Sequence, residues 1–150
     1  MTALRPQMEE VLRYLGHHGQ AMTEEFLAMA ERCIDRVCQA AVPRHCAGSF
    51  VLEKTAEGLK AGGTTLTLTG RDIARLLQNS RRCYLLAATL GPGVDALIRQ
   101  RQAQSMAEAV VCDAAATALI ECVCDEAEKA LAAGLAKGER LTRRYSCGYG

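Results

Sequence analysis

The last residues of the chain combine side chains that could hold a small charged ligand. Arg144 offers a planar fork of hydrogen-bond donors that suits a carboxylate. Gly148 has no side chain, so a ligand could approach the main chain there, and Tyr149 adds a ring and a hydroxyl. On residue types alone, a strand followed by an ordinary glycine turn is the simpler explanation of this segment.

A second set of polar residues recurs along the longest helical pattern. Asp113, Thr117 and Glu121 are spaced by four, which places them on one face of a helix. Acidic groups on such a face could meet a cationic part of a ligand, although a solvated stripe opposite the apolar face explains them more simply. The turn at residues 91–93, Gly-Pro-Gly, could bind an anion at a helix N-terminus. It lacks the glycine motifs of phosphate sites, so a plain strand-to-helix turn is favoured.

Eight cysteines could form disulfides, bind metal or serve as small apolar residues. No Cys-x-x-Cys pair occurs in the sequence. Cys122 and Cys124 lie in a predicted helix, where two steps of about 100° put them on opposite faces. We expect most of the cysteines to be reduced and buried, without metal. The histidines are too scattered to suggest a catalytic base, so we assign no catalytic residue.

Charge and hydropathy exclude two classes of partner. Lys and Arg number 18 against 17 Asp and Glu, which argues against a nucleic-acid binder. No apolar run reaches the roughly 20 residues that span a bilayer, and the N-terminus lacks the apolar stretch of a secretory signal. We therefore expect a cytoplasmic protein with neither a nucleic-acid nor a membrane partner. At 150 residues, the chain fits one domain over residues 1–150.

The spacing of apolar residues predicts an α+β fold, with long helices packed on a small, mainly antiparallel sheet. Thr23 is expected to cap one long helix and Pro43 to end it. The longest helix is expected over 105–136, with Met106, Ala109 and Val110 at the start of its apolar stripe. Other helices are predicted over 6–15, 72–78 and 94–100, and strands over 49–52, 64–69, 83–90 and 141–145, the third strand being covered on both faces.

The segment from Arg144 to Tyr149 matches a pattern, Arg-x-x-x-Gly-Tyr, and so resembles the activation domain of cobalamin-dependent methionine synthase. Residues 10–16, 88–91 and 113–116 are also similar to small stand-alone bacterial relatives of that domain. The similarity runs through most of the chain. The family's domain is longer and completes its ligand groove after the Gly-Tyr pair, so the resemblance implies a native protein that continues beyond Gly150.

The resemblance implies a binding site for S-adenosylmethionine. Arg144 would hold the carboxylate, the main chain at Ser146 and Gly148 would meet the nucleoside, and Tyr149 would complete the motif. The family also uses acidic groups from its helices, which would correspond here to Asp113 and Glu121. Where the family usually has proline before the glycine, this chain has Cys147, which leaves the turn less rigid.

The function implied is that of an accessory domain that binds S-adenosylmethionine while an oxidised cobalamin is reductively returned to methylcobalamin. The expected partners are a cobalamin-binding module or corrinoid protein and an electron donor protein. The chain shows no homocysteine, folate or cobalamin module, so it cannot be a complete methionine synthase methyltransferase in methionine biosynthesis. Two alternatives stay open: a module that docks on a corrinoid protein without S-adenosylmethionine, and a cysteine-rich thiol or metal protein.

Overall fold

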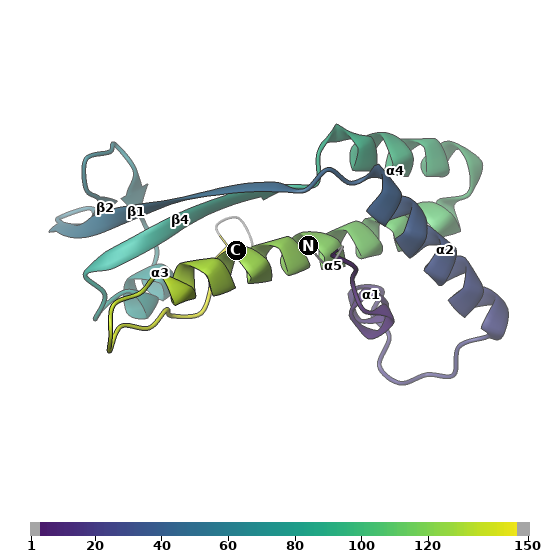
Figure 1. Cartoon of the computed structure of the whole chain (residues 1–150), viewed down its shortest axis with the longest axis horizontal. Coiled ribbons are helices and arrows are strands. Elements are labelled where there is room, and N and C mark those ends of the chain that lie inside the picture. The colour runs from purple at the N-terminus through teal and green to yellow at the C-terminus, as the bar shows by residue number, and fades with distance from the viewer. Residues whose placement is uncertain (1–3, 147–150) are drawn as a thin grey trace. The chain divides into compact units, whose positions relative to one another are not determined.

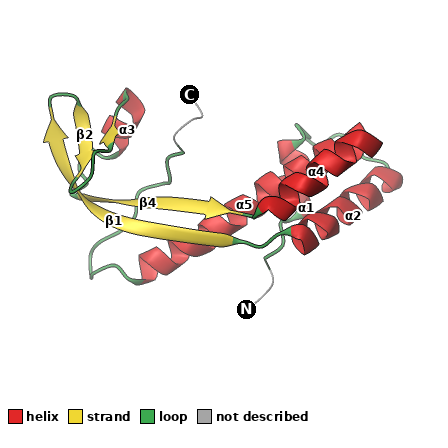
Figure 2. Cartoon of the chain, turned by 90° about the horizontal axis from the view of Figure 1, so that it is seen from above, coloured by secondary structure: helices red, strands yellow, loops and turns green. Residues whose placement is uncertain are grey.

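The computed structural model describes residues 4–146 and has the predicted α+β class. Its contacts divide these residues into two compact units. The helical unit comprises residues 4–45 and 88–128, and the sheet unit comprises residues 46–87 and 129–146. Figures 1 and 2 show the elements of each unit.

The helical unit contains α1 (Met8–Tyr14), α2 (Glu24–Ala40), α4 (Pro92–Gln104) and the part of α5 (Met106–Ala133) up to Glu128. The predicted cap of α2 is confirmed, because the Phe26 N–H donates to Thr23 Oγ1 at 3.2 Å. The helix ends at Ala40, ahead of Pro43, as expected from the missing N–H of proline.

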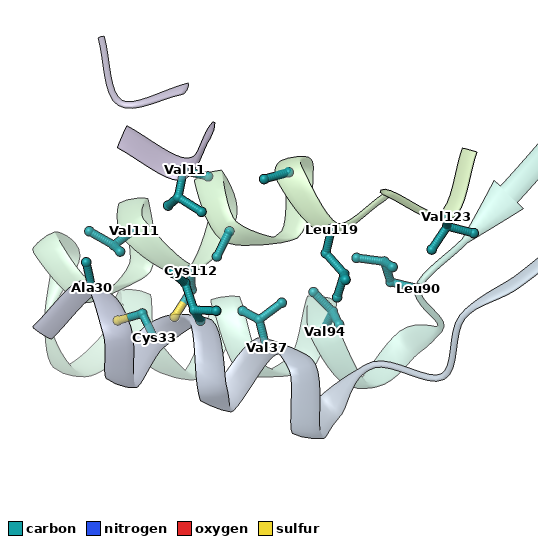
Figure 3. Close-up of a cluster of buried hydrophobic side chains, with 14 residues drawn as sticks. Val11, Ala30, Cys33, Val37, Leu90, Val94, Val111, Cys112, Leu119 and Val123 are labelled. Atoms are coloured by element: carbon teal, nitrogen blue, oxygen red, sulfur yellow. The ribbon is translucent and has the colours of Figure 1, made fainter. Parts of the chain in front are cut away.

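The core of the helical unit is made of small and medium-sized apolar side chains. Thirteen buried residues from α1, α2, α4 and α5, together with Leu90 just before α4, form one cluster, part of which is labelled in Figure 3. Ile34 on α2 and Leu119 on α5 are both 1% exposed. Eleven of the fourteen cluster residues are alanine, valine or cysteine, which are small enough to let the helix backbones approach closely.

The face that α5 buries differs from the prediction at its N-terminal end. Met106 and Val110, expected in the apolar stripe, are 63% and 51% exposed. Val111, Cys112 and Ala115 are buried instead. The helix is apolar around most of its circumference, so periodicity established a helix without fixing the buried face.

The sheet unit is built on four strands in the order β3-β2-β1-β4. The pairs β1–β2 and β2–β3 are antiparallel. Hydrogen bonds from Val42 N–H to the Leu90 carbonyl and from Leu52 N–H to the Arg81 carbonyl show that β1 and β4 also run antiparallel. The elements are β1 (Arg44–Thr55), β2 (Gly58–Ala61), β3 (Thr67–Leu68), the short helix α3 (Arg71–Leu76) and β4 (Arg82–Thr89).

A small apolar cluster holds β2, β3 and α3 together. Leu59 and Leu68 pair across the two strands, and Ile73 and Leu77 pack against them. These buried residues are 5–9% exposed, so each keeps some contact with solvent. The sheet unit therefore has a smaller and shallower core than the helical unit.

The strand predictions were wrong in two places between residues 58 and 69. Strand β2 begins at Gly58, between the strands predicted over 49–52 and 64–69, where no strand was predicted. Strand β3 spans only Thr67–Leu68 rather than 64–69, because Thr64 forms a turn in which its hydroxyl donates to the Ala61 carbonyl at 2.7 Å. Local hydroxyl bonding thus competes with the strand pairing that alternation alone predicts.

Two other strand predictions also need correction. Residues 141–146 form neither strand nor helix, although a strand was predicted over 141–145. A strand needs a hydrogen-bonded neighbour, and no neighbour can be read from a local pattern. Strand β4 was expected to be covered on both faces, but Cys83 is its only buried residue.

None of the helices within residues 4–146 is long and apolar enough to cross a membrane.

Candidate functional site

The acidic candidates lie on one face of α5, as predicted. The Thr117 hydroxyl donates to the Asp113 main-chain carbonyl at 3.0 Å, one helical turn back. Asp113 is exposed and Glu121 is half-buried. The opposite side of this part of the helix is the buried one, with Cys112, Ala115 and Leu119 in the core. The Asp113–Glu121 face can therefore offer carboxylates to a cationic group.

The terminal candidates lie in an irregular segment of the sheet unit. Arg144 and Ser146 are both exposed and follow α5 after the turn around Gly138, whose φ is +90°. Gly148 and Tyr149, like Cys147, lie outside the described residues. Arg144 is thus a solvent-exposed guanidinium in a segment without regular structure, and the guanidinium fork is a group that suits a carboxylate.

The structure distributes the candidates over both units. Asp113 and Glu121 belong to the helical unit, whereas Arg144 and Ser146 belong to the sheet unit. The set is thus not assembled within either unit by itself. Within the helical unit the two carboxylates share a helix face, and within the sheet unit Arg144 and Ser146 are two residues apart in the sequence.

The Gly91-Pro92-Gly93 turn has a local structural explanation. Gly91 has φ +81°, and its N–H donates to Thr89 Oγ1 at 3.0 Å. A Cβ at Gly93 would lie 2.6 Å from the Ala40 carbonyl oxygen, so α4 begins in close contact with the end of α2. Pro92 occupies the first turn of α4, where its missing N–H is tolerated. The glycines therefore serve backbone conformation and packing, which favours the plain turn over an anion site.

Two cysteines meet in the core of the helical unit. Cys33 on α2 and Cys112 on α5 are fully buried and are drawn with neighbouring sulfur atoms in Figure 3. The Cys33 thiol donates to the Glu108 main-chain carbonyl at 3.8 Å. Burial raises the pKa of Cys33 and raises that of Cys112 to about 12. Such thiols stay protonated near neutral pH and act as small apolar side chains.

None of the other cysteines within residues 4–146 forms a disulfide. Cys83 is buried, whereas Cys38, Cys122 and Cys124 are half-buried and Cys46 is exposed. Burial raises the pKa of Cys38, Cys83 and Cys122. Among residues 4–146, no three His, Cys, Asp or Glu side chains gather in a metal-binding arrangement.

Sequence reasoning missed an ion cluster that joins three helices. Glu108 Oε2 on α5 lies 2.8 Å from Arg36 Nη1 on α2 and 3.1 Å from Arg101 Nη1 on α4. Hydrogen bonding from Arg101, with further attraction from Arg36, lowers the pKa of Glu108. The Glu108 N–H also donates to Ser105 Oγ at 3.3 Å. The Ser-x-x-Glu pattern of a helix cap could have indicated that Glu108 is held in place.

Comparison with protein-family models finds no match, and comparison with curated proteins finds no relative.

Proposed function

We propose that this chain binds S-adenosylmethionine and serves as an accessory domain for reductive reactivation of a cobalamin-dependent methyltransferase such as methionine synthase. The observation that carries the proposal is the Arg144-x-x-x-Gly148-Tyr149 pattern. It joins a guanidinium, a glycine main chain and an aromatic ring within six residues. These groups correspond to the carboxylate, the nucleoside and the adenine ring of the ligand.

The exposure of Arg144 supports this role, because a ligand carboxylate can reach it from solvent. Ser146, two residues on, is exposed as well, so its main chain can approach a nucleoside. Asp113 and Glu121 on α5 offer carboxylates for the amino group or the sulfonium, which are the cationic parts of the ligand. The carboxylate, the nucleoside and the cationic groups of the ligand therefore each have a counterpart in this sequence.

In this function the chain supplies binding and positioning, and the cofactors supply the difficult chemistry. Cobalamin resides on a partner module or corrinoid protein, and an electron donor protein provides the reducing equivalent. The chain itself is not assigned a catalytic residue. We place its action in the cytoplasm, where reducing conditions keep cysteines from forming disulfides.

The test is calorimetric titration of S-adenosylmethionine into the purified protein. We expect saturable binding that Arg144→Ala weakens by roughly 1.5–3 kcal/mol, the contribution of a hydrogen bond to a charged group. The matched control is Arg143→Ala, which removes the same charge from the neighbouring exposed residue. Equal losses in both variants would indicate a general effect of charge, and no loss in Arg144→Ala would remove Arg144 from the site.

A second candidate is a docking module for a corrinoid protein that no longer binds S-adenosylmethionine. The observation that favours it is Cys147, which stands where the resembled family usually has proline and leaves the turn less rigid. This candidate predicts a complex with a cobalamin-binding module whose affinity is unchanged by S-adenosylmethionine. Calorimetry with the two proteins, with and without the ligand, separates the candidates.

A further inference from the structure

Strand β4 leaves one side of the described sheet open. The strand order β3-β2-β1-β4 places β4 at an edge, where β1 is its hydrogen-bonded neighbour. Its residues 82–87, Arg-Cys-Tyr-Leu-Leu-Ala, contain no proline, glycine or lysine. Natural sheets usually protect such an edge with those residues, with a bulge, or with a covering segment. An apolar strand with a regular backbone is therefore suited to accept another strand.

The segment 141–145, Leu-Thr-Arg-Arg-Tyr, has the properties of the missing neighbour. It belongs to the same compact unit as residues 82–87. Its composition predicts a strand, yet the structure gives it no regular form. Five residues in the segment can match the six of the β4 edge in length. A strand-forming segment and an open strand edge thus occur together in one unit.

We propose that residues 141–145 add to the outer edge of β4 as a fifth strand when S-adenosylmethionine binds, an inference that rests on the function proposed above. Pairing with β4 would order the segment, at a cost in conformational entropy. Ligand contacts to Arg144 and to the main chain that follows it offset this cost. Main-chain hydrogen bonds to β4 then hold the segment in place.

Strand addition would also arrange the candidate ligand-binding residues. Successive side chains of a strand point to opposite faces, so Arg144 and Ser146 would share one face of the sheet. Leu141, Arg143 and Tyr145 would share the other face. The irregular segment does not turn successive side chains to opposite faces. The shared face of Arg144 and Ser146 would therefore form only when the segment pairs with β4.

The experiment is amide hydrogen exchange measured by mass spectrometry, without ligand and with saturating S-adenosylmethionine. Exchange should slow at least tenfold, in parallel, in peptides that cover 82–87 and 141–145. Calorimetry on the same samples reports ligand binding independently. A saturable titration without this joint protection overturns the strand proposal and leaves the proposed function standing, whereas absence of binding overturns both.

Two neighbouring proline substitutions test the register of the added strand. Alternate residues of an edge strand turn their N–H toward the neighbouring strand, and proline removes that donor. Of Thr142→Pro and Arg143→Pro, one should therefore abolish the ligand-dependent protection while the other preserves it. Equal effects of the two prolines would overturn the proposal. Protection at 82–87 alone that grows with protein concentration would also overturn it, since a second copy of the chain would then occupy the edge.

Discussion

The helical unit and the sheet unit differ in how they are held together. The helical unit buries fourteen residues in one cluster, several of them completely. The cluster of the sheet unit consists of Leu59, Leu68, Ile73 and Leu77, which all keep 5–9% of their surface exposed. Since the stabilising free energy follows the apolar surface removed from water, the helical unit carries most of the stability.

This difference bears on function, because the Arg144 segment belongs to the less stable unit. Ligand-binding segments are commonly found at the low-stability end of a protein, where they can be ordered by the ligand. The helical unit contributes Asp113 and Glu121 from a helix whose other side is packed in the larger core. One set of candidates therefore lies on a well-packed helix and the other on an adaptable segment.

The sharpest test compares the same substitution in the two cores. Leu119→Ala in the helical unit should lower the free energy of unfolding toward the upper end of the ~2–5 kcal/mol range for such truncations. Leu68→Ala in the sheet unit should cost about 2 kcal/mol or less, because its surroundings are shallower and can relax or admit water. Denaturant unfolding of both variants gives the two values. Equal losses would contradict the proposed difference in stability.

A second test concerns the packing of α2 against α4 within the helical unit. Gly93→Ala should destabilise the protein by about 1–3 kcal/mol, the usual cost of overpacking, because the new Cβ would lie 2.6 Å from the Ala40 carbonyl oxygen. The matched control is Gly134→Ala after α5, where the nearest atom lies 3.5 Å away. Thermal unfolding should show a lowered midpoint only for Gly93→Ala. If Gly93→Ala left the unfolding midpoint unchanged, α2 and α4 could move apart at this point without loss of stability.

The sequence predicted best what depends on neighbouring residues in the chain. The cap at Thr23 and the end of α2 before Pro43 are decided by local backbone chemistry, and both were confirmed. The length of α5 was close to the prediction, but its buried face differs from the prediction at the N-terminal end. Val110 and Val111 are equally apolar neighbours, and only packing against α2 and α4 decides which of them is buried.

Strands and the site were harder to predict, because both depend on residues distant in the sequence. Gly58 begins β2 since β1 and β3 lie on either side of it, which no local propensity indicates. The Glu108 cluster brings α2, α4 and α5 together, and only its Ser105 cap was visible in the sequence. Arg144 was found as a candidate from the residue pattern, and its role in binding stays a prediction.

The smallest expected effect on stability comes from the ion cluster around Glu108, and this effect depends on pH. The pKa of Glu108 in the folded protein is lowered from its ordinary value of 4.5, first by hydrogen bonding from Arg101. The carboxylate therefore stabilises the folded state fully above about pH 5. This contribution is lost as the pH falls below 4.5 and through the lowered pKa of the folded state.

Glu108→Gln should accordingly cost about 1 kcal/mol at pH 7 and progressively less toward pH 3, because Arg36 is 38% exposed and solvent screens part of the interaction. The matched control is Glu57→Gln, at an exposed position in the turn between β1 and β2, which should change stability little at either pH.

Amide hydrogen exchange of Glu108→Gln at both pH values shows which elements are destabilised, once the rates are corrected for the intrinsic pH dependence of exchange. Faster exchange at pH 7 confined to α2, α4 and α5 would show that the helical unit opens independently. An equal increase in β2 and β3 would instead show that the two units unfold together, which would overturn the division of stability between them.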